Sequence, residues 1–280
     1  MQKMRIVLTN DDGIEAPGIA AARRALERSE AVSEVLVVAP DRNRSGVGRS
    51  ITFDERLRLK EHPMADGVTG YACSGTPVDC VRLVSLGLMD FEPDLVFSGI
   101  NHGENLGDDI TYSGTVAGAF EGIVIGVPGI AVSLSTERPW HSGVEPELHF
   151  GPVAEFSARL AEAAVEKLPA ERILNVNAPN LPLSELSGTR ITRLGRRLYK
   201  DELVEIADKD GSVTYDIYNN PPRHHHEEGT DLLAVEQGEI SITPVHLNLT
   251  DSDGIQNISG WNLGSLLEDP QDVSGEAETG

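Results

Sequence analysis

The chain has 280 residues, 45 of them acidic and 23 basic, and its formal net charge of −22 repels nucleic acid, so we expect no nucleic-acid partner. It contains no run of 18 apolar residues and no secretory leader, and its two cysteines are too few for a disulfide framework, so we expect a cytoplasmic protein without a membrane span. Because only five of the basic residues are lysines, we interpret the acidic excess as a halophilic adaptation in which salt screens the repulsion.

Short apolar strands alternate with helical patterns through the first two-thirds of the chain. The clearest helix start is at Thr76, a good N-cap that is followed by Pro77 and Asp79 in the first turn. Such alternation predicts an α/β fold of three layers, in which a mostly parallel sheet lies between helices on both faces. The expected strands are 5–9, 34–39, 94–98, 129–134 and 173–176, and the expected helices are 18–28, 76–88, 115–125 and 153–167.

The pattern changes at about residue 189, after which short alternating strands predominate. We therefore divide the chain into an α/β catalytic core (1–188), a β-rich C-terminal arm used in oligomerisation (189–268) and an acidic tail (269–280) that we expect to be disordered. In the arm, the expected strands are 191–194, 203–206, 213–217, 232–235 and 239–250, and a short amphipathic helix is expected at 261–267.

Three polar, glycine-rich segments directly follow predicted strands. In open α/β sheets, ligands bind outside the carboxyl ends of the strands, and long loops without apolar periodicity are usually functional. We therefore expect the three segments to converge on one site. They are TNDDG (9–13), APDRNRSGVGRS (39–50) and SGINHGENLGDDITYSGT (98–115).

Two adjacent carboxylates, Asp11 and Asp12, follow the first strand. They repel each other, so keeping both ionised requires a cation or a ring of hydrogen-bond donors. With the Ser45 hydroxyl and the Asn101 amide oxygen they make the hard oxygen set that Mg²⁺ or Mn²⁺ prefers. The alternative, which residue types alone leave open, is that this segment serves only a turn and a helix start.

The step Ser113-Gly114-Thr115 opens a predicted helix. Its free backbone amides and positive dipole end form an anion pocket, although the same pattern also occurs in plain N-capping. A metal site that faces such a helix start is the arrangement that phosphate-ester hydrolysis requires.

Several other side chains have two candidate roles each, and in most cases the plainer role is preferred. His102 is a candidate proton donor for the leaving group or an ordinary loop histidine. For Asp108 and Asp109, hydrogen bonding within the loop is preferred to a second metal site. Arg42, Arg44 and Arg49 are candidates for phosphate or carboxylate partners, and the sequence does not choose between these. For Tyr112 and Phe120 the core is preferred to base stacking. For His224, His225 and His226 a place in an exposed arm is preferred to the binding of stray transition metals.

Six ordered segments between about Met4 and Asp251 resemble the motifs of the SurE family, the stationary-phase survival nucleotidases. The resemblance implies a Rossmann-like core and a phosphatase that acts on nucleoside monophosphates with one divalent ion per subunit, Mg²⁺ or Mn²⁺. It also implies a homodimer or homotetramer in which the C-terminal segment reaches a neighbour. The segments are VLTNDDGIEAPG, VVAPDRNRSGVGRSIT, CSGTPVDCV, DLVFSGINHGENLGDDITYSGTVAGAFEG, EGTDLLAVEQGEISITP and LNLTD.

The same motifs imply the roles of individual residues. In the hypothesis that follows from them, a cation-activated water attacks phosphorus, and Asp11 and Asp12 are the catalytic carboxylates. Asp12 is the candidate general base or nucleophile, so a phosphoaspartyl route stays open. The implied metal ligands are Asp11, Asp12, Ser45 and Asn101, and the implied phosphate-side residues are Asn105, Ser113, Gly114 and Thr115.

Two rival functions differ in what they require of the sequence. A non-catalytic nucleotide-binding or sensor module needs no set of four hard ligands beside an anion pocket. An NAD-type oxidoreductase needs a G-x-G-x-x-G turn after the first strand, and an acidic pair occupies that turn instead. The preference for base, for 5′- over 3′-phosphate, and for polyphosphate is not readable from the residues.

Overall fold

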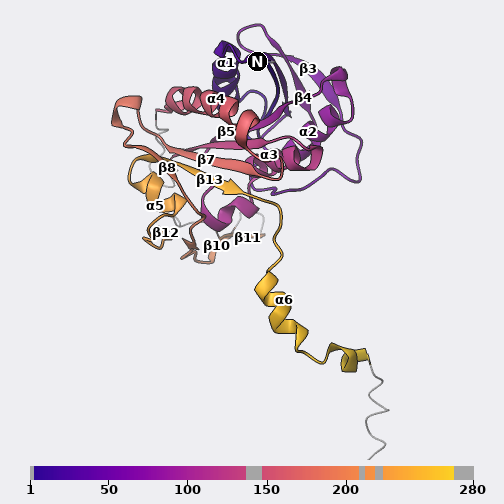
Figure 1. Cartoon of the computed structure of the whole chain (residues 1–280), viewed down its shortest axis with the longest axis vertical. Coiled ribbons are helices and arrows are strands. Elements are labelled where there is room, and N and C mark those ends of the chain that lie inside the picture. Colours follow the sequence, from indigo (N-terminus) through magenta and orange to yellow (C-terminus); the bar gives the residue numbers. More distant parts are fainter. Residues whose placement is uncertain (1–2, 137–146, 208–211, 218–222, 268–280) are drawn as a thin grey trace, which may run out of the picture. The chain divides into compact units, whose positions relative to one another are not determined.

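The computed structural model describes residues 3–136, 147–207, 212–217 and 223–267 (Figure 1). Residues Met1–Leu247 form one compact unit, and Asn248–Gly280 form a second. The tail expected at 269–280 lies outside the described residues. Among the helices that are described, none combines the length and the apolar character needed to cross a bilayer.

A nine-stranded sheet runs through the first unit in the order β3-β4-β2-β1-β5-β6-β7-β13-β8. Its central strands, from β4 to β7, are all parallel. At one edge β3 runs antiparallel to β4; at the other, β13 runs antiparallel to β7 and β8 runs parallel to β13. The strands are β1 Met4–Thr9, β2 Val32–Pro40, β3 Leu59–Pro63, β4 Thr69–Cys73, β5 Leu95–His102, β6 Gly129–Ser135, β7 Ile173–Pro179, β8 Gly188–Ile191 and β13 Glu239–Val245.

Helices cover both faces of this sheet, as the alternating pattern predicts. On one face, α1 packs beside α4, and on the other α2 packs beside α3. Because successive strand residues point to opposite faces, Ile6 and Leu8 join the core under α1 and α4, whereas Val7 joins the core under α2. The three-layer α/β fold is therefore confirmed. The helices are α1 Pro17–Arg28, α2 Pro77–Ser85, α3 Gly114–Ile125, α4 Phe150–Lys167 and α5 Asp231–Glu236, with 3-10 turns η1 Leu88–Asp90, η2 Gly107–Thr111 and η3 Leu183–Glu185.

Several expected elements differ from the structure. The predicted strand 232–235 is wrong, because these residues form α5, whose N-cap Thr230 accepts a hydrogen bond from the amide of Leu233. The strands β3 and β4 were not predicted, and the expected strand 239–250 ends at Val245. In the second unit, α6 Ser252–Ser259 was not predicted, and the helix expected at 261–267 is the 3-10 turn η4 Leu263–Leu267.

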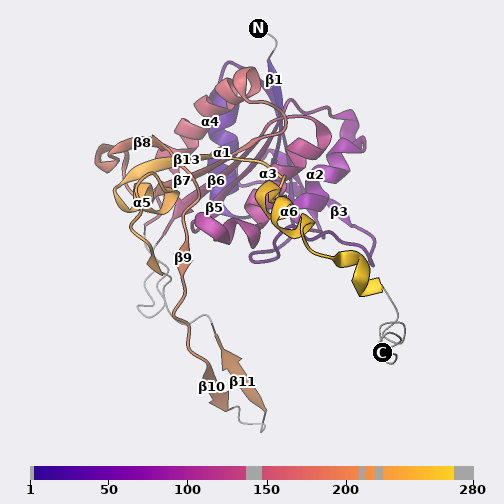
Figure 2. The ribbon, with the colours of Figure 1, turned by 60° about the horizontal axis from the view of Figure 1, so that its bottom comes forward.

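Beyond residue 188 the chain contributes both to the sheet and to separate small elements. β8 and β13 extend the nine-stranded sheet past β7. β9 Arg197–Leu198 pairs with β12 Arg223–His224, and β10 Val204–Ala207 forms a separate hairpin with β11 Val213–Asp216. Figure 2 shows this hairpin standing away from the sheet.

The chain order of the strands defines a switch point beside β1. From β1 the chain passes to β2 on one side of it and later returns to β5 on the other side, where Thr9 pairs with Ser98. Ligands of open α/β sheets bind in the crevice at such a point, beyond the carboxyl ends of the two strands. The residues after Thr9 and those at the end of β5 are therefore the first place to look for a site.

Candidate active site

Asp11 and Asp12 directly follow β1 at the switch point. The chain turns at Gly13, whose φ is +102° and whose ideal Cβ would lie 3.1 Å from the carbonyl carbon of Arg42. The Asn10 side-chain amide closes this turn by donating to the carbonyl of Gly13 at 2.9 Å. The two carboxylates reach other segments of the chain, Asp11 at Thr115 and Asp12 at His102.

The Asp11 carboxylate lies against the first turn of α3. The Thr115 hydroxyl donates a hydrogen bond to Asp11 Oδ1. An ideal Cβ on Gly114 would lie 2.8 Å from Asp11 Oδ2, so only glycine allows this approach. The backbone also brings the second polar loop to this point, because the Arg44 amide donates to the Asp11 carbonyl at 2.6 Å.

Asp12 is half-buried and contacts the end of β5. Its Oδ2 accepts a hydrogen bond from the backbone amide of His102 at 2.9 Å. The preceding residue, Asn101, is buried and donates its side-chain amide to the carbonyl of Gly103 at 2.9 Å, which leaves its amide oxygen available as a ligand. A register irregularity between Ser98 and Asn101 sets this orientation.

The buried position of Asp11 has an electrostatic consequence. Burial, reinforced by the neighbouring charge of Asp12, raises the pKa of Asp11 to about 6, although the Thr115 hydroxyl acts in the opposite direction. A positive ion beside the carboxylate offsets such desolvation and favours the charged form. The donor chemistry here, two carboxylates and an amide oxygen, thus fits a hard divalent cation.

Ser45 is exposed, and its backbone amide donates to Asn43 Oδ1 at 2.7 Å. It is one residue from Arg44, whose amide contacts Asp11, just as Asn101 is one residue from His102, whose amide contacts Asp12. Two hydrogen bonds, each donated by a backbone amide, therefore join the three polar segments beyond the carboxyl ends of the strands, as the sequence predicts.

The hydroxyls of the predicted anion pocket already have partners within the protein. Ser113 is the N-cap of α3, and its Oγ accepts a hydrogen bond from the amide of Val116 at 3.0 Å. Thr115 donates its hydroxyl to Asp11. Because Ser113 Oγ only accepts in this bond, its O–H can still donate to an anion beside the free amides of the first turn. The carboxylate of Asp11 partly offsets the positive end of the helix dipole.

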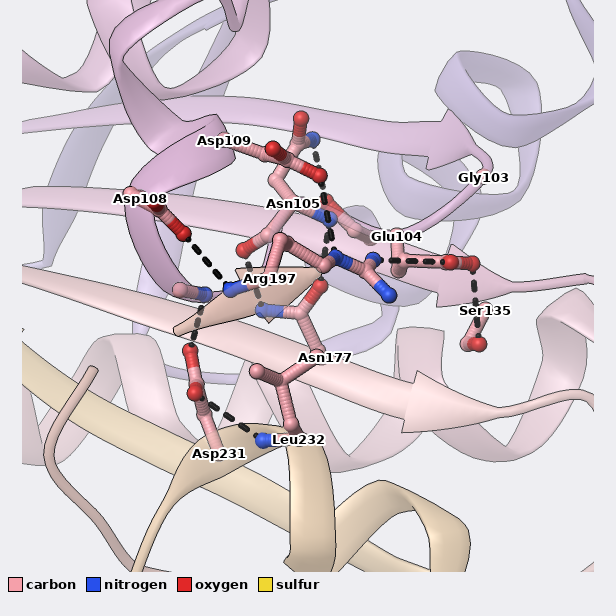
Figure 3. A network of polar contacts seen from close by, with 12 residues as sticks. Gly103, Glu104, Asn105, Asp108, Asp109, Ser135, Asn177, Arg197, Asp231 and Leu232 are labelled. Carbon is pink, nitrogen blue, oxygen red and sulfur yellow. Dashed lines mark hydrogen bonds and ion pairs between the residues drawn. The ribbon is translucent and has the colours of Figure 1, made fainter. Parts of the chain in front are cut away.

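Asn105 is fastened to β6 and β7. Its side-chain amide donates to Ser133 Oγ at 2.8 Å, and its own backbone amide donates to Asn177 Oδ1 at 2.8 Å. Its carbonyl accepts from the side chains of Asn175 and Asn177 at 2.8 and 3.0 Å. These bonds hold the middle of the third polar loop against the sheet, and Figure 3 shows Asn105 beside Asn177.

The rest of that loop is held by Arg197 of β9, which the sequence did not indicate. Its guanidinium binds Glu104 Oε1 at 2.9 Å and Asp109 Oδ2 at 3.0 Å, and its backbone amide donates to Asp108 Oδ1 at 3.0 Å (Figure 3). The hydroxyl of Tyr199 also donates to Asp109. The carboxylates of Asp108 and Asp109 therefore bond outside the loop, to residues about 90 positions away, and not within it as expected.

Asp231, the first residue of α5, completes this framework. Its carboxylate accepts hydrogen bonds from the amides of Gly107, Gly195 and Leu232 at 2.8, 2.8 and 2.9 Å. Burial raises its pKa, although the three amides favour the charged form. Asp231 thus joins the polar loop, the segment before β9 and α5 through a single buried side chain.

A family model described as Survival protein SurE matches residues 6–201 of this chain. The chain belongs to the SurE family. The 5′-nucleotidase SurE of Rubrobacter xylanophilus is 69% identical over 266 residues, which cover 94% of this chain and 99% of that protein. The 5′-nucleotidase SurE of Geobacter sulfurreducens is 43% identical over 273 residues, covering 97% and 99%. A crystal structure of the SurE protein from Aquifex aeolicus has a TM-score of 0.74 and 40% identity, covering 95% of this chain and all of that one.

In this SurE chain, the structure also distinguishes among three arginines of the second polar loop. Arg49 pairs with the buried carboxylate of Glu121 at 2.6 Å, and the Arg44 guanidinium donates to the carbonyl of Ser74. The Arg42 guanidinium is exposed and has no partner in the described part of the chain, and the Arg42 backbone packs on Gly13.

Two aromatic residues near α3 occupy different environments in this SurE chain. Phe120 packs against the core beneath α3, whereas Tyr112 is 66% exposed directly before Ser113. The reading of Tyr112 as a core residue is therefore wrong. His102 is exposed as well, and the described contact of this residue is made by its backbone amide.

Proposed function

We propose that this chain is a metal-dependent nucleotidase that hydrolyses nucleoside 5′-monophosphates to nucleoside and phosphate. The observation that carries the proposal is the pair Asp11 and Asp12 at the switch point, with Asp11 buried against the first turn of α3. The proposal is also supported by two relatives that align with this chain over almost their whole length, because both are named 5′-nucleotidase SurE.

Asp11, Asp12, Ser45 and Asn101 would hold one Mg²⁺ or Mn²⁺ ion. A cation there would neutralise phosphate charge and make a nearby water easier to deprotonate around neutral pH. The buried Asp11 carboxylate, whose pKa of about 6 reflects desolvation, is the group that gains most from such an ion.

The side chains and amides around Asp11 and Asp12 have separate proposed roles in catalysis and substrate binding. Asp12 is half-buried, so of the two carboxylates it is the one accessible to a water proton, which makes it the proposed general base. The Gly114 amide and the Ser113 hydroxyl at the start of α3 would stabilise charge on the phosphate oxygens, whereas Thr115 would act by holding Asp11. Arg42 and the exposed Tyr112 are proposed to contact the phosphate and the base, respectively.

The deciding experiment measures phosphate release by chelator-stripped protein. With AMP and added Mn²⁺ or Mg²⁺ we expect turnover, and with chelator or in Asp11→Asn we expect none. A panel of 5′- and 3′-monophosphates and polyphosphate then defines the substrate. If the stripped protein binds AMP but releases no phosphate with any divalent ion, the chain is a binding or sensor module and the nucleotidase proposal is wrong.

Assembly through the C-terminal segment is part of the same proposal. In the second unit, α6 and η4 carry large apolar side chains that are exposed in the single chain, and contiguous exposure of this kind usually marks an interaction surface. We expect a homodimer or homotetramer in which a neighbouring subunit covers them. The side chains are Ile255, Ile258, Trp261, Leu263, Leu266 and Leu267.

Light scattering coupled to size-exclusion chromatography tests this assembly. The full chain should elute as a dimer or tetramer, and a chain ending at Leu247 should elute as a smaller species. A full chain that remains monomeric at high protein concentration would contradict the proposed assembly without affecting the proposed chemistry.

A further inference from the structure

Two histidines and a glutamate come together on elements that carry none of the active-site residues. His224 ends β12, His226 follows two residues later, and Glu236 is the last residue of α5. Glu236 Oε2 lies 3.4 Å from His224 Nε2 and 3.1 Å from His226 Nδ1. One ligand atom from each residue lies within 4.8 Å of the other two.

The hydrogen bond on the other side of the His224 ring determines which nitrogen faces Glu236 with a lone pair. His224 Nδ1 is 3.1 Å from the backbone oxygen of His225. A carbonyl oxygen can only accept, so Nδ1 carries the proton, and Nε2 of the neutral ring presents its lone pair to Glu236. The Nε2 lone pair and the Glu236 carboxylate oxygen are 3.4 Å apart and repel each other unless a positive charge, from a second ring proton or a metal ion, lies between them.

A metal ion supplies that charge to all three groups at once. Nitrogen and oxygen ligands of a tetrahedral zinc ion lie about 2.0–2.1 Å from it and therefore about 3.4 Å from each other. The two separations at Glu236 are 3.4 and 3.1 Å. The backbone carbonyl that binds His224 Nδ1 is also the kind of outer partner that orients a metal-binding histidine.

The donor set indicates which metal would bind. Two imidazoles and one carboxylate suit Zn²⁺ and its neighbours among the transition metals, whereas Mg²⁺ and Mn²⁺ prefer oxygen ligands. Nearby glutamates do not compete for the ion, because Glu227 pairs with Arg193 at 2.7 Å and Glu228 pairs with Arg190 at 2.8 Å.

We propose that His224, His226 and Glu236 form a zinc-type metal site that is separate from the Asp11–Asp12 site. Three protein ligands leave the fourth position of the ion to water. The site would join β12 to the end of α5. In the strand pairing, His224 lies opposite Arg197 of β9, which holds the third polar loop. The helix α5 begins at Asp231, which also bonds to that loop.

Binding should therefore stabilise the fold as well as occupy the site. A ligand that binds only the folded state raises the unfolding midpoint, and at about a hundredfold excess over Kd the rise for a chain of this size is several degrees. The variants His226→Asn and Glu236→Gln should lose this rise. Both side chains are partly or largely exposed, so the variants should fold.

The experiment uses the full chain without an affinity tag, stripped of metal and titrated with Zn²⁺ by calorimetry. We expect His226→Asn and Glu236→Gln to lose one zinc equivalent, or to bind it at least about tenfold more weakly. The matched control is His225→Asn, which keeps the backbone carbonyl and removes the imidazole of the same triplet that lies outside the cluster. It should bind zinc as the wild type does.

Co²⁺ provides an independent measurement of the geometry. In the wild type and in His225→Asn, Co²⁺ should give the strong visible absorption of a four-coordinate site, and this absorption should be absent in Glu236→Gln. The proposal is overturned if the two ligand variants bind as many zinc ions as the wild type. It is also overturned if His225→Asn loses as much binding as His226→Asn, since the triplet would then bind without a defined geometry.

Discussion

The hydroxyl of Thr115 donates a hydrogen bond to Oδ1 of Asp11, and these two residues are 104 positions apart in the chain. The bond fastens the start of α3 to the end of β1 at the switch point of the sheet. It satisfies one carboxylate oxygen, but burial still raises the pKa of Asp11 to about 6. The site therefore holds a carboxylate in a position that disfavours its charge.

Asp11→Asn should separate the role of this residue in stability from its role in activity. The folded state binds the Asp11 proton more tightly than the unfolded state does. This difference lowers the unfolding free energy of the wild type. The loss is absent below about pH 4 and complete above about pH 6, where it reaches roughly 2–3 kcal/mol. In chelator, the variant should therefore be more stable than the wild type at pH 7.5 by about 1–3 kcal/mol, and the difference should shrink toward pH 4.

Urea unfolding at several pH values measures this difference, and phosphate release from AMP with Mn²⁺ measures the activity. The same variant should lose at least about 100-fold in kcat/KM, because a ligand of the cation is gone. A variant that is more stable yet nearly as active as the wild type would show that Asp11 does not bind the catalytic metal.

Metal binding at this site should depend on pH in the range where Asp11 titrates. Below about pH 6 a proton competes with the cation for the carboxylate, so the apparent affinity for Mn²⁺ should fall by about tenfold for each pH unit. Titration with Mn²⁺ followed by electron paramagnetic resonance at pH 5, 6 and 7.5 measures this dependence. Equal affinity at pH 5 and 7.5 would contradict the placement of Asp11 among the ligands.

The elements that could be predicted are those with a strong local signal. The apolar run before Thr9 indicates β1, and the capping box of Thr76 and Asp79 marks the start of α2. The short run 232–235 has four apolar residues, which fit a short strand as well as a helix because they are too few to show a helical period. Its decisive signal was the N-cap Thr230.

The edge strand β3 and its neighbour β4 could not be found in the same way. Their sequences, LKEHP and TGYAC, mix polar residues with glycine and proline. Their conformation depends on pairing, of β4 with β2 and of β3 with β4. In the site, too, residues with a local signal could be predicted and residues placed by long-range contacts could not. Asp11, Asp12 and Asn101 were indicated because each lies where a predicted strand ends, whereas Arg197 reaches Asp109 across 88 positions and has no local pattern.

Gly114→Ala should disturb the contact between α3 and the end of β1. The added Cβ would lie 2.8 Å from both Cβ and Oδ2 of Asp11, so the helix start must move away. We expect a loss of about 1–3 kcal/mol in unfolding free energy and of about tenfold or more in kcat/KM.

The matched control is Gly151→Ala in α4, where an added Cβ has no atom of the described chain within 4 Å apart from its own helix backbone and chain neighbours. It should be neutral or stabilising by up to about 1 kcal/mol, since alanine favours the helix. If the two variants behave alike in thermal unfolding and in AMP hydrolysis, the close approach of α3 to Asp11 has no functional importance.

Arg197→Met should loosen the third polar loop without touching Asp11 or Asp12. The Arg197 side chain is 6% exposed, and its removal leaves Glu104 and Asp109 without their cation. Breaking such a buried pair destabilises a fold by about 3–5 kcal/mol, and the partial exposure of both carboxylates lowers our expectation here to about 2 kcal/mol. Arg197→Lys should recover only part of the loss, because an ammonium cannot bind both carboxylates with the planar geometry of a guanidinium.

The control for this prediction is Arg193→Met, which removes an ion pair with Glu227 in which both side chains are about half exposed. It should change the unfolding free energy by less than about 1 kcal/mol and leave kinetics unchanged. For Arg197→Met, Asn101 and Asn105 lose the support of the loop that contains them, so kcat/KM for AMP should fall by about tenfold at saturating Mn²⁺. Steady-state kinetics at several Mn²⁺ concentrations distinguish this loss from weaker metal binding. Wild-type kinetics in a destabilised Arg197→Met would mean that the network supports only the fold.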